Sequence, residues 1–210
     1  MNPEKKQLFL VRHGTTADNE ADILQGRVDN PLSETGLREA RQVAEYMHGE
    51  SIQAVFSSPM LRARQTAEAI ATALQLPIQI IDNFCEIDLG EWEGQKYEMV
   101  QKKYADFHLR WVADSSLPVP GGESFDQVFT RVAVGLPLLW KEQATSMVLV
   151  GHATVNRAVL GNLIGMPATA ARLFRTQNAS ISKLVLFDLP DRRYSVVDYW
   201  NCTAHLQGAP

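Results

Sequence analysis

Short apolar runs alternate with helical segments along almost the whole chain. Each of four apolar runs is bounded by turn residues or charges, as is typical of buried strands. Between them, apolar residues recur every three or four positions, the period of an amphipathic helix. This alternation predicts a largely parallel sheet covered by helices on both faces. The expected strands are 8–12, 53–58, 77–81 and 146–152, and the expected helices lie within 36–47, 58–74, 121–140 and 153–165.

Two β-rich runs follow near the end of the sequence. Residues 180–189 and 192–200 are joined by Pro190, Asp191 and Arg192, which predicts a hairpin. A hairpin added to a parallel sheet gives that sheet an antiparallel edge. The expected fold class is therefore α/β, a three-layer α/β/α sandwich with a mostly parallel central sheet and an antiparallel edge.

Capping residues and prolines mark several expected helix ends. Ser58 followed by Pro59 predicts the start of the second helix, because proline is favoured at the first helical position. Ser124 and Gln127 match a capping box at the start of the third. Pro137 lies late in that helix and is expected to kink or end it, because proline removes a backbone donor.

The composition is that of a folded protein. Hydrophobic residues make up 45% of the chain and charged residues 21%, which is enough to build a sizeable core. The 20 Lys and Arg against 24 Asp and Glu give a net charge of −4. Because no basic run is present, neither nucleic acid nor an anionic membrane is an expected partner. Cys85 and Cys202 fit no disulfide framework or CxxC pair and are expected to be reduced.

One soluble, cytoplasmic domain is expected. No window approaches the roughly 20 apolar residues of a membrane span, and no apolar signal-peptide core follows the first residues. No repeat, low-complexity tract or linker divides residues 1–210. A lid-like insertion is expected around 92–122, where two polar, aromatic-containing helices and a loop are predicted.

Chemically active side chains gather where the expected strands end. In open α/β sheets, ligands bind at the carboxyl ends of the strands. The first strand ends in Arg12 and His13, and the second leads into a helix that bears Arg62. Glu86 follows the third strand, and His152 ends the fourth. The fold is expected to bring these two imidazoles, two guanidinium groups and one carboxyl group to one edge of the sheet.

Each of these residues also has an ordinary interpretation. Arginines at strand ends are mostly solvated, and a histidine after an apolar run can be a core residue. Arg62 differs from Arg64 because it shares its helix row with small residues, which indicates a covered position where a cation needs an anion. His13 and His152 end the similar runs FLVRH and VLVGH, and this repetition favours a site over two separate core histidines.

The sequence lacks the motifs of several other classes of functional site. It contains no GxxxxGK[ST] phosphate loop, no GxGxxG after a strand, no GxSxG elbow and no HExxH zinc helix. The remaining histidines, His48, His108 and His205, are interpreted as structural. The glycine pair before Glu123 is interpreted as a turn that leads into the capped helix, with lining of a ligand entrance as the alternative.

A set of motifs in fixed order closely resembles the histidine phosphatase superfamily, the fold shared by cofactor-dependent phosphoglycerate mutases and many small phosphatases. The motifs are VRHGTTADN, LQGRVDNPLSETG, FSSPMLRARQTA, CEIDLGEWEG, PGGESF and VGHATVNRAVL. The resemblance implies that His13 is the nucleophile that becomes phosphohistidine and that Glu86 donates a proton. It also implies a phosphate pocket of Arg12, Arg62 and His152, and ligand contacts from Asn19, Gln25, Gly26 and the Ala153 backbone.

The implied chemistry suits these side chains. Two displacements on an imidazole nitrogen split a very slow hydrolysis into two easier steps. His13 has to attack as the neutral ring, and flanking Arg12 and Arg62 disfavour its protonated form. The arginines also offset the phosphoryl charge, so neither a metal nor a cofactor is expected. Asp88, two residues after Glu86, is a rival acid that sequence geometry does not separate from it.

The expected function is hydrolysis of a small phosphate ester. Mutases of this family typically carry an extra segment between the acid and the second histidine, and the short interval from Glu86 to His152 favours a phosphatase. The alternatives are mutase-type phosphotransfer and a non-catalytic phosphate-binding protein. The motifs resemble α-ribazole phosphatases and also the broad-specificity and sugar-phosphatase branches, so the ester stays open. Thr15 stands where relatives often carry Glu or Gln, and the hairpin edge offers a surface for a homodimer.

Overall fold

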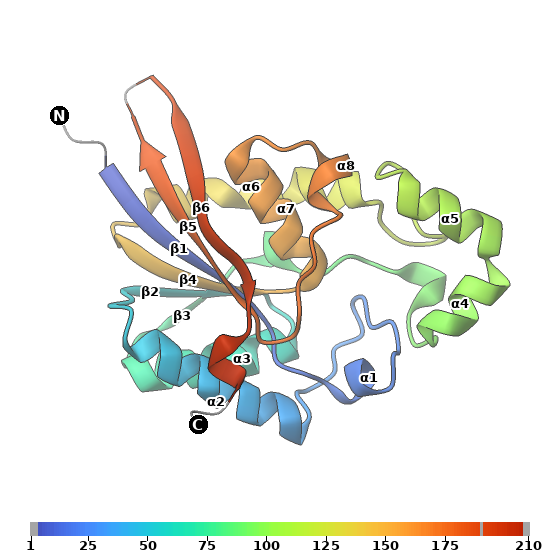
Figure 1. Ribbon diagram of the computed structural model, residues 1–210, viewed down its shortest axis with the longest axis horizontal. Coiled ribbons are helices and arrows are strands. Elements are labelled where there is room, and N and C mark those ends of the chain that lie inside the picture. The colour runs from blue at the N-terminus through green and yellow to red at the C-terminus, as the bar shows by residue number, and fades with distance from the viewer. Residues whose placement is uncertain (1–3, 190, 208–210) are drawn as a thin grey trace.

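A six-stranded sheet with the order β3-β2-β4-β1-β5-β6 runs through the centre of the protein (Figure 1). The structure is a computed structural model that describes residues 4–189 and 191–207. The strands are β1 (Glu4–Arg12), β2 (Ala54–Ser57), β3 (Ile78–Ile80), β4 (Ser146–Gly151), β5 (Ile181–Asp188) and β6 (Arg193–Cys202).

The sheet is parallel on one side and antiparallel on the other. β1, β4, β2 and β3 pair in parallel, whereas β5 runs antiparallel to both β1 and β6. The predicted parallel sheet with an antiparallel edge is therefore confirmed. Asp191 and Arg192 lie between β5 and β6 as expected, and Pro190, the third residue predicted for this hairpin, is outside the described residues.

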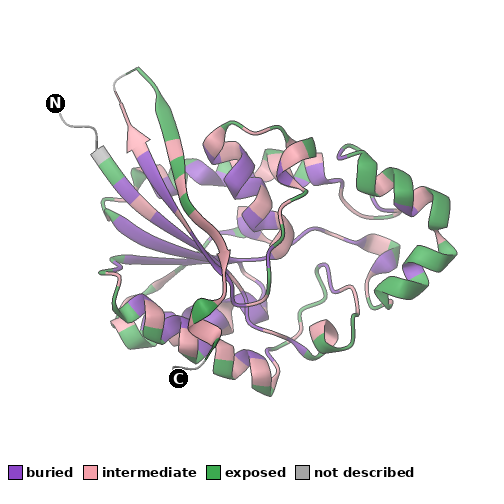
Figure 2. Cartoon of the chain, in the orientation of Figure 1, coloured by how far each residue is buried: buried purple, intermediate pink, exposed green. Residues whose placement is uncertain are grey.

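Helices cover both faces of the sheet and complete the three predicted layers (Figure 1). Leu8 and Leu10 of β1 belong to one apolar core and Phe9 and Val11 to the other, because successive strand residues point to opposite faces. α6 and α7 contribute to the first core, and α2 and α3 to the second. Figure 2 shows the buried residues concentrated in the central strands and the inward faces of these helices. The helices are α1 (Ala17–Glu20), α2 (Glu34–His48), α3 (Leu61–Leu74), α4 (Tyr97–Lys103), α5 (Ala105–Ala113), α6 (Phe125–Lys141), α7 (Ala153–Ile164) and α8 (Ala168–Ala171), with 3₁₀ turns at Asp82–Phe84, Gly90–Trp92 and Ala204–Leu206.

The start of α3 differs from the prediction. The helix begins at Leu61 rather than at Pro59, and it has no side-chain cap. Asp29 from a neighbouring loop accepts a hydrogen bond from the Leu61 backbone N–H at 2.6 Å, so an orphan donor of the first turn is satisfied from outside the helix. The Ser58 hydroxyl is thereby free to take part in the site described below.

The start of α6 follows the prediction. The Ser124 hydroxyl accepts from the Gln127 backbone N–H at 3.2 Å, and the Gln127 side chain accepts from the Ser124 backbone N–H at 2.7 Å. This is the expected capping box. α6 continues to Lys141, so Pro137 does not end the helix.

Backbone hydrogen bonds align the carboxyl ends of three neighbouring strands. β1 and β2 lie on either side of β4. The His13 N–H donates to the Gly151 carbonyl at 3.0 Å, and the Ser58 N–H donates to the Val150 carbonyl at 3.0 Å. Residues that follow these three strands, His152 among them, are therefore placed side by side at one edge of the sheet.

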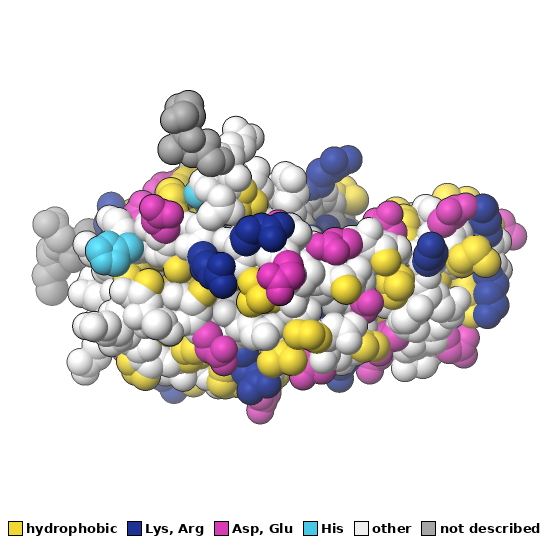
Figure 3. Space-filling model, turned by 90° about the horizontal axis from the view of Figure 1, so that it is seen from below, with side chains coloured by type: hydrophobic (Ala, Val, Ile, Leu, Met, Phe, Trp, Pro, Cys, Tyr) yellow, Lys and Arg dark blue, Asp and Glu magenta, His cyan; other side chains and the backbone are white. Residues whose placement is uncertain are grey.

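The segment predicted as a lid-like insertion forms α4 and α5, which extend away from the sheet on the right of Figure 1. Trp92 anchors this segment: its ring lies 5.1 Å from that of Trp111 and 6.0 Å from that of Phe107. Seen from below, the surface mixes positive and negative side chains with scattered apolar ones (Figure 3). Across residues 4–189 and 191–207, no helix has the combination of length and apolar character that crossing a membrane requires.

Close backbone packing predicts that Gly36 of α2 cannot be replaced. A Cβ at this position would lie 1.9 Å from the Thr15 carbonyl oxygen. Alanine favours a helix over glycine by about 1 kcal/mol, but the clash displaces the loop that follows His13 and costs about 1–3 kcal/mol. We expect Gly36→Ala to lower the free energy of unfolding in urea. Gly49→Ala, at the other end of α2 with its nearest contact at 3.5 Å, is the matched control; equal stability of the two variants would contradict the prediction.

Candidate active site

A cavity of about 350 Å³ lies at the aligned strand ends. Residues from widely separated parts of the sequence meet there, as the strand-end analysis predicts. The His152 ring packs against that of His13, and Ala153 is the first residue of α7; neither is among the residues that line the cavity. The predicted site residues that do line it are Arg12, His13, Asn19, Gln25, Gly26, Arg62 and Glu86.

His13 is held in one tautomer. Its Nδ1 lies 2.7 Å from the Gly14 carbonyl oxygen. Because a carbonyl only accepts, Nδ1 carries the ring proton and Nε2 keeps its lone pair. The side chain is 3% exposed. Burial, and then the charges of Arg12 and Arg62, hold the pKa of His13 well below its ordinary value, so the ring is a neutral nucleophile at physiological pH.

His152 packs against His13, with the two ring centroids 5.1 Å apart. Its Nε2 lies 2.7 Å from the Ser58 hydroxyl, and its buried Nδ1 has no partner among the described residues. The Ser58 oxygen already accepts from the Met60 N–H at 3.3 Å, so its own proton is available to Nε2. Burial, and then the charge of Arg62, hold the pKa of His152 well below its ordinary value.

The two predicted phosphate-pocket arginines are positioned by backbone carbonyls. Arg12 Nη1 donates to the Thr176 carbonyl at 2.7 Å. Arg62 Nη1 and Nη2 donate to the carbonyls of Val28 and Gly26 at 2.8 and 2.7 Å. Carbonyls orient a guanidinium group without cancelling its charge. Burial lowers the pKa of Arg12 to about 10, which leaves this side chain charged at neutral pH.

Gly26 and Asn19 shape the mouth of the cavity. Gly26 has φ +51°, and a Cβ there would lie 2.2 Å from a carboxylate oxygen of Glu93, so only glycine fits the turn that supports Arg62. The Asn19 side-chain oxygen accepts from Asn178 Nδ2 at 2.9 Å and from the Thr16 N–H at 3.2 Å. With that oxygen engaged, the Asn19 NH₂ is the group available to a ligand.

Glu86 and Asp88, which the sequence leaves as rivals, occupy different surroundings. Glu86 is 8% exposed and lines the cavity; its Oε1 accepts from the Ile87 N–H at 2.8 Å and its Oε2 from the Thr154 N–H at 3.3 Å. Asp88 accepts from the Gly90 N–H at 2.9 Å, lies 3.8 Å from an Arg27 nitrogen, and is not among the residues that line the cavity. Geometry therefore favours Glu86 as the acid.

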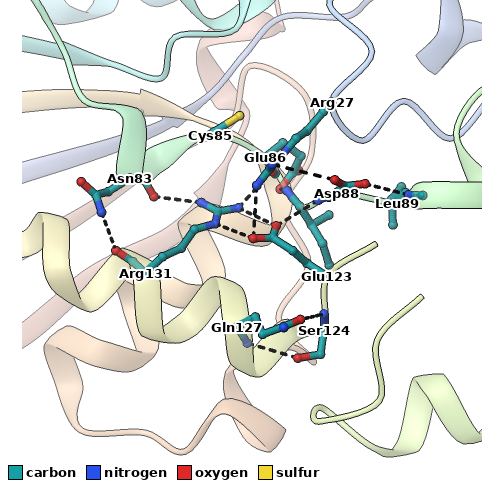
Figure 4. A network of polar contacts seen from close by, with 12 residues as sticks. Arg27, Asn83, Cys85, Glu86, Asp88, Leu89, Glu123, Ser124, Gln127 and Arg131 are labelled. Carbon is teal, nitrogen blue, oxygen red and sulfur yellow. Dashed lines mark hydrogen bonds and ion pairs between the residues drawn. The ribbon is translucent and has the colours of Figure 1, made fainter. Parts of the chain in front are cut away.

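A network of ion pairs fixes the loop that carries Glu86 (Figure 4). Arg131 of α6 donates to the carbonyls of Glu86 and Asn83, each at 2.9 Å. The Glu123 carboxylate receives Arg131 Nε at 3.0 Å and lies 3.1 Å from an Arg27 nitrogen. Glu123 thus joins the turn before α6 to the acid loop, a role that neither sequence interpretation of this position included.

Several residues at the cavity were not predicted from the sequence. The Ser58 hydroxyl contacts His152, and Thr154, Arg157 and Arg172 line the cavity. Arg157 follows Ala153, a predicted ligand contact, by four residues, which is one turn further along the same helix face, so helical spacing from Ala153 indicates it. Arg172 follows α8, a four-residue helix that carries no periodic signal.

The remaining histidines have structural surroundings. His108 is buried between the rings of Trp92 and Tyr97, at 5.9 and 5.4 Å, and His205 lies 3.0 Å from the Ala179 carbonyl. Exposed His48 is in the last turn of α2. Within residues 4–189 and 191–207, no three or more His, Cys, Asp or Glu side chains are grouped to hold a metal ion.

The family model described as the histidine phosphatase superfamily, branch 1, matches residues 8–202. The chain belongs to the histidine phosphatase superfamily. The family predicted from the ordered motifs is therefore confirmed.

Sequence relatives in the superfamily have more than one described activity. Phosphoserine phosphatase 1 of Hydrogenobacter thermophilus is 33% identical over 202 residues, 95% of this chain and 94% of that protein. A probable phosphoglycerate mutase of Yersinia pestis is 31% identical over 203 residues, 95% and 94% of the two chains. A bifunctional protein of Mycobacterium tuberculosis is 36% identical over 156 residues, 73% of this chain, and the match spans only 43% of that protein.

Solved structures of phosphatases share the fold. A mycobacterial glucosyl-3-phosphoglycerate phosphatase in complex with VO3 superposes with a TM-score of 0.87 at 26% identity, over 94% of this chain and all of that one. A putative α-ribazole-5′-phosphate phosphatase of Escherichia coli gives a TM-score of 0.82 at 28% identity, over 94% and 96% of the two chains. The predicted fold is confirmed by this similarity.

The two buried imidazoles predict a loss of stability in acid. Because the pKa of each is lowered in the folded protein, the unfolded chain binds more protons. The contribution of the two neutral rings to the free energy of unfolding is therefore fully present above the unfolded pKa of about 6.5. It is lost as the pH falls below that value. When the pH is lowered from about 7.5 to about 5.5, each ring lowers the free energy of unfolding by about 1.4 kcal/mol.

We expect His13→Asn and His152→Asn each to remove about 1.4 kcal/mol of this pH-dependent loss, measured by urea unfolding in phosphate-free buffer. His48→Asn is the control, because its ring is exposed in the folded protein. If all three variants showed the pH dependence of the unmodified protein, the two rings would not be buried in the neutral form.

Proposed function

We propose that this protein is a metal-independent hydrolase of small phosphate monoesters that works through a phosphohistidine on His13. The observation that carries the proposal is a neutral His13 ring, with its proton on Nδ1, beside the guanidinium groups of Arg12 and Arg62, neither of which forms an ion pair with a carboxylate within residues 4–189 and 191–207. A phosphate dianion supplies the charge that this cluster lacks, and its oxygens match the guanidinium donors. The buried Nε atoms of Arg12 and Arg62 have no partner among the described residues, and an ester phosphate satisfies such donors.

In the first step, His13 Nε2 attacks phosphorus and the bond from phosphorus to the ester oxygen breaks. Arg12 and Arg62 stabilise the charge on the equatorial oxygens. His152, with its proton on Nδ1, donates a further hydrogen bond to them. Glu86 gives its carboxyl proton to the departing alkoxide, which leaves as the alcohol. The product is phosphohistidine and an ionised Glu86.

In the second step, a water molecule enters where the alcohol was. Glu86 takes a proton from it while the water oxygen attacks phosphorus, and the bond between phosphorus and Nε2 breaks. Inorganic phosphate is released, the lone pair returns to Nε2, and Glu86 is again protonated. The Gly14 carbonyl holds the proton of Nδ1 throughout, so the ring needs no change of tautomer.

Hydrolysis rather than mutase transfer is favoured by the segment between the acid and the second histidine. It contains the 3₁₀ turn Gly90–Trp92, α4, α5, α6 and β4 with connecting loops, and no further helix or strand. A mutase has to exclude water from the phosphoenzyme, whereas a phosphatase has to admit it. The cavity remains connected to the surface past exposed Tyr97 and Val112, which suits the entry of water.

Rapid quenching tests the covalent intermediate. With a radiolabelled phosphomonoester and EDTA present, we expect an acid-labile, alkali-stable phosphoprotein and steady release of free phosphate. His13→Asn should form none and lose at least about 10²-fold in kcat, because it removes the nucleophile. In a parallel incubation with 3-phosphoglycerate, formation of the isomerised product in place of free phosphate would show that the protein is a mutase. If neither phosphoprotein nor product formed with any ester, the protein would be a phosphate-binding protein instead.

The proton donor is tested with two esters of different leaving group. Glu86→Gln should lower kcat/KM about 10²–10⁴-fold for an alkyl phosphate, whose alkoxide needs a proton. The loss should be much smaller for 4-nitrophenyl phosphate, because nitrophenolate leaves without one. Asp88→Asn is the matched control and should lack this dependence on the ester. The same selective loss in Asp88→Asn, and not in Glu86→Gln, would reverse the assignment.

A further inference from the structure

Two more arginines, Arg157 and Arg172, line the outer part of the cavity that contains His13. Neither has a place in the two steps above. Arg157 lies one turn into α7, and Arg172 directly follows α8. Besides burial, the charge of Arg157 lowers the pKa of Arg12, and the charge of Glu86 raises that of Arg157, so Arg157 interacts electrostatically with groups used in the two steps above.

Both arginines lack a protein counter-ion within 4.0 Å among the described residues. Arg157 Nε and Arg172 Nη1 are buried and have no hydrogen-bond partner within the part of the chain that the structure describes. Burial lowers the pKa of Arg157, and the charge of Arg172 acts in the same direction. Two partly buried cations that repel each other are costly to place together unless an anion joins them.

The carboxylates nearest to Arg172 do not neutralise it. Asp114 and Asp126 oppose the lowering of the Arg172 pKa by burial, yet neither forms an ion pair with it in the described residues. One oxygen of the Asp114 carboxylate, Oδ1, accepts hydrogen bonds from the N–H and hydroxyl of Ser116, at 2.9 and 2.7 Å. The Arg172 guanidinium therefore keeps unused donors toward the cavity.

An aromatic surface holds Arg172 in place. Its guanidinium carbon lies 5.1 Å from the centre of a Trp111 ring and 6.0 Å from that of Phe125. Contact with ring faces supports a guanidinium group while leaving the N–H donors at its edge free. Around it the cavity is apolar, with Leu89, Trp92, Val112 and Leu173 among its lining residues.

We propose that the outer cavity is a second anion-binding site, in which Arg172, with Arg157 behind it, binds a carboxylate or second phosphate on the alcohol part of the substrate. The apolar lining takes the body of that alcohol, a ring or hydrocarbon segment between the two anions. This assignment rests on the proposed function, because it describes the leaving group of the same reaction. The substrate class is thus a phosphate monoester of an acidic, partly apolar alcohol.

Matched aryl esters test the assignment. We compare kcat/KM for 4-carboxyphenyl phosphate and 4-carbamoylphenyl phosphate, which have the same shape and differ in charge, and repeat the comparison with the 3-substituted isomers to vary the distance. The ratio of carboxylate to amide ester is determined for each variant, so intrinsic reactivity and general damage to the enzyme cancel. For at least one isomer, Arg172→Gln should lower this ratio at least about tenfold, the size of a charge-assisted hydrogen bond.

Two variants serve as controls. Arg172→Lys keeps the positive charge, so its carboxylate-to-amide ratio of kcat/KM should lie between those of the unmodified enzyme and Arg172→Gln. Arg110→Gln removes an arginine that stacks on Phe107 at 5.8 Å and is not among the cavity-lining residues, so its ratio should equal that of the unmodified enzyme. An unchanged ratio in Arg172→Gln for both isomers, with all esters hydrolysed, would overturn this assignment and leave the proposed function intact. Failure to hydrolyse any of the esters would overturn both.

Discussion

The site depends on positive charge that is buried without a matching anion. Arg62 is 1% exposed, and it and Arg12 are held by backbone carbonyls rather than by carboxylates. Among the described residues that line the cavity, Glu86 is the one with an acidic side chain. Removing a cation from water costs several kcal/mol unless an anion compensates. This desolvation free energy is already spent when the chain folds, and a bound phosphate dianion compensates for it.

Burial, and then the same charges, keep the two histidines neutral. A ring buried beside guanidinium groups stays neutral, and the Gly14 carbonyl decides which nitrogen of His13 keeps the proton. The groups that bind the phosphoryl oxygens therefore also prepare the nucleophile. The sheet makes this possible because the β2, β4 and β1 ends are aligned by backbone hydrogen bonds, and strands are stiffer supports than loops. If Arg157 and Arg172 bind a second anion, the same principle extends along the cavity to the choice of substrate.

Much of this arrangement could be predicted from the sequence, because its strand residues follow simple rules. Apolar runs indicate the strands, and the rule that ligands bind at carboxyl ends predicts that His13 and His152 lie close together. Glu86 and Asp88 could not be separated in this way. They lie in a loop between 3₁₀ turns, where side-chain direction follows no period and is set by Arg131, more than forty residues later in the chain.

Contacts between distant segments explain the other differences. Ser58 has the sequence context of a helix cap, but Asp29 satisfies the first turn of α3 instead and leaves the hydroxyl to His152. Arg172 belongs to a segment without hydrophobic periodicity, and its place in the cavity depends on Trp111 of α5. Local patterns carry no information on such pairings, because each is decided by packing between elements.

The central claim is that the arginine-rich site keeps His13 neutral with its proton on Nδ1. The most direct measurement is ¹⁵N NMR of the histidine side chains at about pH 6.0 without phosphate, with His13→Asn to assign the signals. The account predicts a protonated, pyrrole-type Nδ1 and an unprotonated, pyridine-type Nε2 for His13, at a pH where an ordinary imidazole is mostly charged. Two imidazolium-type nitrogens in that ring, or the proton on Nε2, would contradict it.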